Sequence, residues 1–263
     1  MPTLFAEPRF VESLDDCIFY HTIDLPGFGT QPGMWDLRAN VEKYLGQVDL
    51  QGKRVLEMGT ATGYLCFHME SQGADVIALE LGPDEVSDIV PYARIYISQR
   101  AAEMEPWLEK IRNAFWFSHK AMNSSASVVY GHVYNVPGEL GKVDVSTFGS
   151  ILLHFRDPFL ALQNALRLTR ETVIITEPIW NRLNHLRFRV LGKRWGSYTV
   201  FLPHGKVSEP PTTWWYLSPA AIQRFIGVLG FEDSTVTYHS QRYAEADKDV
   251  LCYTVVGKRT VPL

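Results

Sequence analysis

Cysteine is scarce in this chain of 263 residues, which has three, at positions 17, 66 and 252. Their odd number and wide spacing argue against a disulfide framework or a cysteine metal site and favour a reducing compartment. The first residues lack a basic start followed by an apolar run, and no apolar run approaches the ~18 residues that span a membrane. Positive charge is not in excess, and the net charge of −4 gives no overall attraction to nucleic acid. We therefore expect a soluble cytoplasmic protein without a signal peptide.

From about residue 53 onward, short apolar runs alternate with helical patterns, and the length suits one large domain with an insertion. Strands are predicted near residues 53–58, 75–80, 127–130, 143–153, 171–177, 231–239 and 249–257. Helices are predicted at 63–72, at 107–123, and after Asp157-Pro158 and Ser218-Pro219, where a capping side chain precedes a proline. Residues 82–106 look irregular. This order predicts an α/β fold with a mostly parallel sheet, covered on both faces, and a final antiparallel hairpin.

The segment 54–65, RVLEMGTATGYL, has the strand, glycine turn and helix start of a nucleotide-binding unit. A dinucleotide fingerprint needs a second glycine for the pyrophosphate, but position 61 is alanine, and no Lys-Ser/Thr pair follows for a P-loop. Glu80 ends the next strand, 21 residues after Gly59, where a carboxylate can accept hydrogen bonds from both ribose hydroxyls. A phosphate-free nucleoside, S-adenosylmethionine, is therefore predicted. The alternative is that the glycines serve only close packing. Candidate cofactor-binding residues here are Gly59, Thr60, Thr62, Gly63, Glu80 and Leu81.

The run V-L-E-x-G-x-x-x-G, with an acid after the second strand, resembles motif I of the class I S-adenosylmethionine-dependent methyltransferases. The resemblance covers residues 53–178 and 213–257. It implies a Rossmann-like, doubly wound sheet of seven strands with the last one antiparallel. It also implies that Glu57 orients the methionine end of the cofactor. Further cofactor-binding positions implied by the family are His132 and Val133, beside the adenine, and Phe148 and Gly149.

Three further segments resemble a narrower subgroup, the tRNA wobble-uridine 5-oxyacetate methyltransferases and their small relatives: 19–27 (FYHTIDLPG), 32–38 (PGMWDLR) and 152–158 (LLHFRDP). In that subgroup the upstream segment folds over the cofactor. The resemblance thus implies an N-terminal arm or lid, residues 1–50, before a methyltransferase domain, residues 51–263. Tyr20, His21, Trp35 and Arg38 are then candidates to close the pocket, although Tyr20 and Trp35 also fit ordinary packing aromatics.

This chain departs from the tRNA enzymes in two ways. It has Leu153 where they have a tyrosine, and it lacks their long N-terminal extension. The unusual carboxylated cofactor of those enzymes needs polar and cationic partners, which a leucine does not supply. Both departures favour the ordinary methyl donor and weaken the assignment to tRNA.

Methyl transfer requires alignment of acceptor, methyl and sulfur with water excluded, and a base only where the acceptor must lose a proton. His154, after the fourth strand, is the first candidate base and His21 the second, because imidazole titrates near neutral pH. His154 also fits a structural hydrogen bond beside the next helix start. Glu177 is either a group that holds an acceptor hydroxyl or amine, or a solvated acid at a strand end.

An insertion at about 179–212 is the clue to the acceptor. It contains basic residues without an acid between 178 and 195, interleaved with aromatic residues: Arg182, Arg187, Arg189, Lys193 and Arg194, with Trp180, Phe188 and Trp195. This composition fits a solvated cap, an anion-binding lid or a nucleic-acid surface. Candidate substrate residues are Trp180, Trp214, Trp215 and Tyr216, which suit a flat or ring-bearing acceptor but also fit packing at the sheet edge.

The sequence therefore predicts an S-adenosylmethionine-dependent methyltransferase that acts without a metal on oxygen or nitrogen of a small molecule. One alternative is a tRNA-modifying methyltransferase, and another is a cofactor-binding protein that no longer transfers methyl groups. No membrane partner is expected, and the oligomeric state is left open, a homodimer included.

Overall fold

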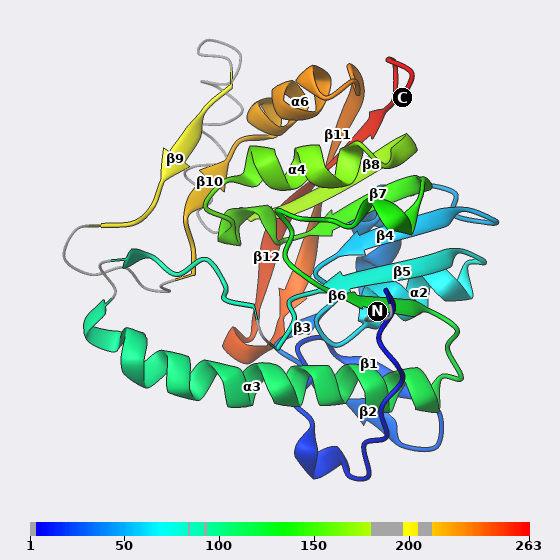
Figure 1. The fold of residues 1–263 in the computed structure, drawn as a ribbon, viewed down its shortest axis with the longest axis vertical. Helices are drawn as coiled ribbons and strands as arrows, with labels where there is room; N and C mark the ends of the chain where they lie inside the picture. The colour runs from blue at the N-terminus through cyan, green and yellow to red at the C-terminus, as the bar shows by residue number, and fades with distance from the viewer. Residues whose placement is uncertain (1–3, 84, 92–93, 180–196, 205–211) are drawn as a thin grey trace.

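In the computed structural model, which describes residues 4–83, 85–91, 94–179, 197–204 and 212–263, one large mixed sheet dominates the fold (Figure 1). Its eight strands follow the order β3-β11-β12-β8-β7-β4-β5-β6. They are β3 (Trp35–Asp36), β4 (Arg54–Met58), β5 (Asp75–Glu80), β6 (Ser127–Tyr130), β7 (Val143–Gly149), β8 (Thr169–Ile179), β11 (Asp233–Tyr243) and β12 (Lys248–Lys258).

All seven predicted strands are present, but the predicted total of seven is wrong. β11 extends to Tyr243, beyond the predicted end near residue 239, and its far end pairs antiparallel with residues 35–36 of the N-terminal arm. The arm thus supplies an eighth strand, β3. β12 runs antiparallel to both β8 and β11, so the predicted orientation of the last strand is confirmed. The five strands from β6 to β8 pair in parallel.

Helices cover both faces of the sheet (Figure 1). The apolar residues of the arm, α2 and α3 form one buried cluster, and those of α4 and α6 form another on the opposite face. The α-helices are α1 (Val41–Tyr44), α2 (Tyr64–Ser71), α3 (Arg94–Ala121), α4 (Pro158–Leu166) and α6 (Pro219–Val228). None of the helices in the described ranges combines the length and apolarity needed to cross a lipid bilayer.

The shorter elements lie in the arm and in the connections. Two small antiparallel ribbons are formed by β1 (Ile23–Leu25) with β2 (Gly29–Gln31), and by β9 (Thr199–Phe201) with β10 (Trp215–Leu217). The 3-10 helices are η1 (Leu14–Asp16), η2 (Arg38–Asn40), η4 (Gly138–Leu140), η5 (Leu152–His154) and η6 (Ala244–Ala246).

The predicted starts of two helices are confirmed. The Asp157 carboxylate accepts a hydrogen bond from the Leu160 N–H at 2.9 Å and caps α4. The Ser218 hydroxyl accepts one from the Ala221 N–H at 3.1 Å and caps α6. Each cap satisfies a backbone donor that has no partner within its helix.

Two predicted boundaries are wrong. The helix expected from residue 107 begins at Arg94 and contains Pro106, so the proline does not mark its start. The strand expected to reach residue 153 ends at Gly149, because Ser150 has a φ of +54°, which an extended strand cannot include. Residues 152–154 instead form η5.

The arm is bound to the domain by backbone and side-chain hydrogen bonds. The Thr22 N–H donates to the Trp35 carbonyl at 2.7 Å, which folds the arm back on itself. The Tyr44 carbonyl accepts from the hydroxyls of Thr176 (2.6 Å) and Thr254 (3.2 Å), on two central strands. The His21 N–H donates to the Thr62 hydroxyl at 3.3 Å, which brings the arm to the glycine turn. The division into an arm and a domain at residue 50 stays a prediction.

Gly33 is expected to be essential for the packing of the arm. A Cβ there would lie 2.3 Å from the backbone carbon of His21 and 2.5 Å from the backbone nitrogen of Thr22, so the backbone itself would have to move. Gly33→Ala should therefore lower the free energy of unfolding by about 2 kcal/mol, or roughly 4–8 °C in Tm. The control is Gly227→Ala in α6, where a Cβ meets nothing within 4 Å and alanine favours the helix. Equal thermal unfolding of the two variants by circular dichroism would contradict this expectation.

Candidate active site

The glycine turn, residues 59–63, joins β4 to α2 through three residues with positive φ. These are Gly59 (+76°), Ala61 (+50°) and Gly63 (+85°). Ala61 therefore adopts a backbone conformation that glycine would adopt more easily. Its N–H donates to Oε2 of Glu80 at 2.7 Å. Position 61 thus has a glycine-like backbone conformation although the residue is alanine, and its N–H is bound to the acid on the neighbouring strand.

Glu80 lies at the end of β5 and holds the glycine turn in place. Its Oε1 accepts from the Leu81 N–H at 2.9 Å, while Oε2 accepts from Ala61. Burial raises the pKa of Glu80, and these backbone N–H groups offset part of that rise. Each carboxylate oxygen has a second lone pair, so Glu80 can accept further hydrogen bonds from hydroxyl groups of a ligand.

Several buried polar atoms around the turn have no hydrogen-bond partner among the described residues. Glu57 and Thr147 are paired in register on β4 and β7, so their side chains project from the same face of the sheet. Thr60 lies in the turn, and His21 donates its N–H to Thr62 of the same turn. The atoms are Oε2 of Glu57, Oγ1 of Thr60, Oγ1 of Thr147 and Nδ1 of His21, although the Thr60 hydroxyl lies near enough to Glu57 to lower the pKa of its carboxyl. Buried polar groups in folded proteins nearly always have partners, so a set of this kind suits a polar ligand.

Among these residues Glu57 has the greatest need of a partner, because its side chain can carry a charge. The residue is only 2% exposed, and burial raises its pKa to about 8, with the Thr60 hydroxyl lowering it in part. A buried carboxyl without a cation is costly to ionise. A ligand that brought a positive group beside Glu57 would stabilise the ionised form.

The arm places two predicted residues near the glycine turn. His21 is buried, and desolvation lowers its pKa to about 4, which makes it a neutral imidazole at physiological pH. Tyr20 meets the His21 ring edge-on with ring centroids 4.9 Å apart, and burial raises its pKa. The Trp35 ring packs against the Tyr243 ring of β11 with ring centroids 4.8 Å apart, which fits the interpretation of Trp35 as a packing aromatic.

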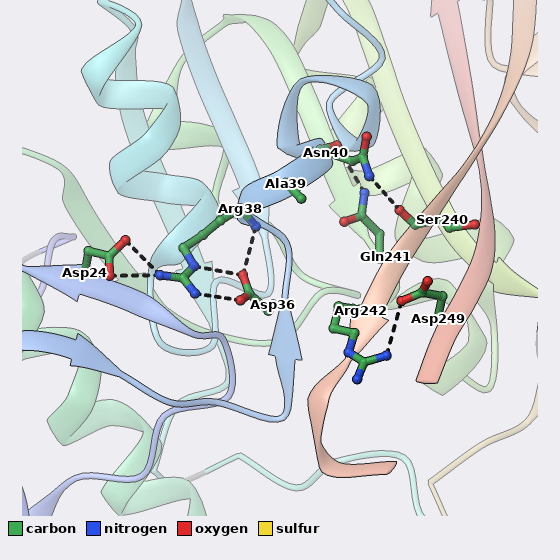
Figure 2. A pocket seen from close by; sticks show the side chains of 9 residues that line it. All are labelled: Asp24, Asp36, Arg38, Ala39, Asn40, Ser240, Gln241, Arg242 and Asp249. Carbon is green, nitrogen blue, oxygen red and sulfur yellow. Dashed lines mark hydrogen bonds and ion pairs between the residues drawn. The ribbon is translucent and has the colours of Figure 1, made fainter. Parts of the chain in front are cut away.

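Arg38 lies in a different environment from the glycine turn. Its guanidinium pairs with Asp24 at 2.9 Å and with Asp36 at 2.7 Å, as Figure 2 shows. Together with Arg242 and Asp249 these residues line an open groove of 660 Å³ between the arm and β11. No lining residue belongs to the glycine turn or to η5. Because two carboxylates occupy the guanidinium, the predicted role of Arg38 in closing the cofactor pocket gains no support from this arrangement.

The residues predicted beside the adenine follow β5 and β6. The Gly131 N–H donates to the Glu80 carbonyl at 3.0 Å, which brings the start of the 131–135 loop to the end of β5. In that loop the His132 ring lies 4.7 Å from the Tyr134 ring, and its Nδ1 accepts from the Tyr134 N–H at 3.3 Å. Val133 is buried beside them. Leu81 follows Glu80 directly, and its N–H is the donor to Oε1.

The other two cofactor candidates lie at the end of β7. Phe148 fills the core on the α4 and α6 face, opposite the face that Glu57 occupies. Gly149 permits close packing, because a Cβ there would lie 3.1 Å from the Leu65 side chain and 3.2 Å from the Tyr44 hydroxyl. Phe148 is thus a core residue in this structure, and Gly149 brings the strand end close to α2 and the arm.

His154 ends η5, where the structure brings together two of the predicted catalytic residues. Its Nδ1 lies 2.8 Å from the Thr212 carbonyl, so Nδ1 carries the proton and Nε2 is the acceptor nitrogen. Burial lowers the pKa of His154, which keeps the ring neutral. Glu177 lies beneath the same turn, and its Oε1 accepts from the Leu152 N–H at 2.9 Å. Glu177 is 4% exposed, so its interpretation as a solvated acid at a strand end is wrong.

The aromatic residues after the insertion are bound to this turn. The Trp214 N–H donates to the Leu153 carbonyl at 2.8 Å, and its indole Nε1 donates to the Asp88 carbonyl at 2.9 Å. The Trp215 indole donates to the Arg156 carbonyl at 3.1 Å. Tyr216 pairs with Val200 in the β9–β10 ribbon. Trp180 and the basic residues Arg182, Arg187, Arg189, Lys193 and Arg194 lie outside the described residues, as do Phe188 and Trp195.

Sequence reasoning missed Asp88, in the stretch that looked irregular. Its side chain is 6% exposed, accepts from the Arg156 N–H at 2.7 Å and receives a hydrogen bond from the Tyr134 hydroxyl. Asp88 thus joins the loop after β5, the loop after β6 and the start of α4. Only its neighbours in space distinguish it from the other acids of that stretch, so no sequence signal could have found it.

The described residues contain no group of three or more histidine, cysteine or acidic side chains arranged to hold a metal ion. The polar groups of the site are carboxylates, hydroxyls, imidazoles and backbone N–H groups.

No protein-family model matches the sequence, and no curated protein matches it either. Among solved structures, the chain is similar to magnesium protoporphyrin IX methyltransferase (ChlM) from Synechocystis PCC 6803 with bound SAH. The TM-score is 0.53 at 13% identity, over 85% of this chain and 81% of that one. The same enzyme with bound SAM gives a TM-score of 0.50, also at 13% identity, over 85% and 77% of the two chains.

A third similar structure comes from work on the conversion of a disulfide bond into a thioacetal group during echinomycin biosynthesis. It has a TM-score of 0.51 at 14% identity, over 84% of this chain and 81% of that one. Identities this low establish a shared fold alone. Together with the strand order and the antiparallel last strand, these similarities show a mixed α/β fold with one large central sheet, consistent with the Rossmann-like fold of methyltransferases.

Proposed function

We propose that this protein is an S-adenosylmethionine-dependent methyltransferase that methylates oxygen or nitrogen of a small molecule. The observation that supports it best is the pair of acids on adjacent strands at the glycine turn. Glu80 receives the turn's backbone N–H and keeps lone pairs for two ribose hydroxyls. Glu57 offers a buried oxygen without a partner among the described residues, suited to the ammonium of an amino acid.

The residues present fit this cofactor better than a phosphate-bearing one. Arg112 is near enough to lower the pKa of Glu80, but its guanidinium pairs with Glu105 and Glu109. A pyrophosphate beside Glu57 and Glu80 would therefore meet two acids and no unpaired guanidinium among the described residues. S-adenosylmethionine supplies a methyl group activated by a sulfonium. In the proposed complex Glu80 would bind the ribose, Glu57 the methionine end, and His132 with Val133 the adenine.

The chain's own contribution to the reaction would be alignment, exclusion of water and removal of a proton. His154 is in its neutral form, with Nδ1 bound to the Thr212 carbonyl and Nε2 as the acceptor nitrogen. It would take the proton of an acceptor hydroxyl or amine as the new bond to carbon forms. Trp214 is hydrogen-bonded to the same turn, so it would present an aromatic surface to a flat acceptor.

The proposed function is tested first by binding. Calorimetric titration of the full chain with S-adenosylmethionine, S-adenosylhomocysteine and NAD should show binding of the first two alone. Methyl-labelled donor is then incubated with the protein and separate pools of small metabolites and bulk tRNA. Label in the metabolite pool supports the proposal, whereas label in tRNA would replace it with the tRNA-modifying alternative. Tight donor binding without label in either pool would indicate a protein that no longer transfers methyl groups.

His154→Ala is expected to lower the rate of label transfer to the accepting pool by about 10²- to 10⁴-fold, as loss of a general base does. The dissociation constant for S-adenosylmethionine should stay within about threefold of wild type, because His154 is not assigned to the cofactor. His68→Ala, which removes an imidazole paired with Glu42 in the last turn of α2, is the control and should transfer at the wild-type rate. A His154→Ala protein that transfers label as fast as this control would remove the base assignment.

A further inference from the structure

The connection between β7 and α4, here called the His154 turn (residues 150–154), has an unusual start. Ser150 has a φ of +54°, a left-handed conformation that costs free energy for any residue but glycine. Its N–H donates to the Thr176 carbonyl at 2.6 Å, and its hydroxyl lies 2.8 Å from the Tyr44 hydroxyl. Contacts from β8 and from the arm therefore maintain this conformation.

The middle of the His154 turn is held by Glu177 through backbone groups. Oε1 of Glu177 accepts from the Leu152 N–H at 2.9 Å, and the N–H groups of Ile151 and Leu153 interact with the same carboxyl. The N-cap residue Ile151 provides no side-chain acceptor, so the first backbone donors of η5 depend on this buried acid. Burial raises the pKa of Glu177 to about 8, so most of the carboxyl is protonated at neutral pH. Its carbonyl oxygen can accept the hydrogen bond in either state.

The end of the His154 turn connects to the acceptor side. The Leu153 carbonyl accepts from the Trp214 N–H, and the His154 ring is bound to the Thr212 carbonyl. A displacement of the 151–153 backbone would therefore move the imidazole and the aromatic segment together. Alignment to within a fraction of an ångström matters for a displacement reaction.

We propose that Glu177 is a positioning residue, which fixes the His154 turn through its backbone N–H groups instead of binding the acceptor. The effect of Glu177 on catalysis rests on the proposed function, since the turn that Glu177 fixes carries the candidate base His154. It differs from the sequence-based expectation that Glu177 holds an acceptor hydroxyl or amine. A group that serves by accepting a hydrogen bond can be replaced by glutamine, whereas an acid that takes a proton cannot.

The test compares full-length wild type, Glu177→Gln and Glu177→Leu by amide hydrogen exchange and by NMR of the His154 imidazole. Exchange of the Leu152 amide, relative to the core amide of Ile175, should be about 10- to 100-fold faster in Glu177→Leu and near wild type in Glu177→Gln. In Glu177→Leu the His154 ring should lose its preference for the Nδ1–H tautomer, and its pKa should move toward the ordinary value of 6.5. Glu57→Leu, which removes another buried acid whose pKa is raised to about 8, should leave the Leu152 amide protected.

Two outcomes overturn the proposal. Unchanged Leu152 exchange and unchanged His154 signals in Glu177→Leu would show that the carboxyl does not fix the turn. Equally accelerated exchange of the Leu152 amide in Glu177→Gln and Glu177→Leu would show that Glu177 does not act by accepting hydrogen bonds. Neither measurement uses the cofactor, so they remain decisive if wild-type protein fails to bind S-adenosylmethionine. That failure would remove the proposed function alone.

Discussion

Replacing Glu80 with alanine should raise the dissociation constant for S-adenosylmethionine by at least about 100-fold. Two hydrogen bonds to an ionised carboxylate contribute about 1.5–3 kcal/mol each, and each 1.4 kcal/mol is a factor of about ten. The substitution also removes the acceptor of the Ala61 N–H, so the glycine turn loses its link to β5. Isothermal titration calorimetry measures the affinity directly.

The matched control for this experiment is Glu85→Ala. Glu85 follows β5 by a few residues and has an exposed side chain, so its replacement changes the net charge equally without touching the glycine turn. Its dissociation constant should stay within about twofold of wild type. Circular dichroism of both variants checks that the fold is retained. Unchanged affinity in a folded Glu80→Ala protein would remove the assignment of the ribose to this acid.

The local parts of this fold were predictable from the sequence. β4, the glycine turn, α2 and β5 follow one another with signals that depend on nearby residues, namely apolar runs, glycines and a stop at Gly73. The caps of α4 and α6 are equally local, because a side chain there bonds an N–H three residues ahead. The position of Glu80 beside the glycine turn was predictable for the same reason, since the end of a strand fixes its place relative to the neighbouring turn; its binding of a ribose stays a prediction.

Features that depend on distant residues were not predictable. The eighth strand forms because residues 35–36 meet the end of β11, about 200 positions later in the chain. Asp88 and Glu177 acquire their roles from backbone groups that other segments bring to them. The sequence shows an acid at each position but not whether its partner is water, an acceptor or an N–H group. Burial decides between these, and burial is a property of the whole fold.

Ala61 illustrates the same limit within a local motif. The missing glycine argued correctly that the turn differs from a dinucleotide fingerprint, yet the backbone at position 61 still has a positive φ. The cost of that conformation is offset by the hydrogen bond from its N–H to Glu80, a residue 19 positions away. Alanine carries a methyl group at the position where the second glycine of a dinucleotide fingerprint lets a pyrophosphate approach the backbone. We therefore expect this residue to affect the choice of ligand more than the shape of the turn.

Affinity for S-adenosylmethionine should rise with pH, by up to about 100-fold between about pH 5.5 and about 7.5. Glu57 has a pKa raised to about 8 in the free protein, so it holds its proton in this range. An ammonium bound beside it would stabilise the carboxylate and lower that pKa. The complex therefore holds fewer protons than the free protein. Binding must release a proton, and it strengthens as pH rises until Glu57 is already ionised.

The measurement is calorimetric titration at several pH values and in two buffers with different ionisation heats, which counts the released protons. Glu57→Gln cannot titrate, so it should lose both the proton release and most of the pH dependence. Glu177→Gln is the matched control, because it removes an acid with the same raised pKa that is not assigned to the cofactor. For both acids the native state keeps a proton that the unfolded chain has lost, so stability falls as pH rises from about 4.5 toward about 8. Each glutamine variant should reduce the decrease in the free energy of unfolding with rising pH. Only Glu57→Gln should also reduce the dependence of S-adenosylmethionine affinity on pH. A wild-type affinity that is independent of pH across this range would show that no cation binds beside Glu57.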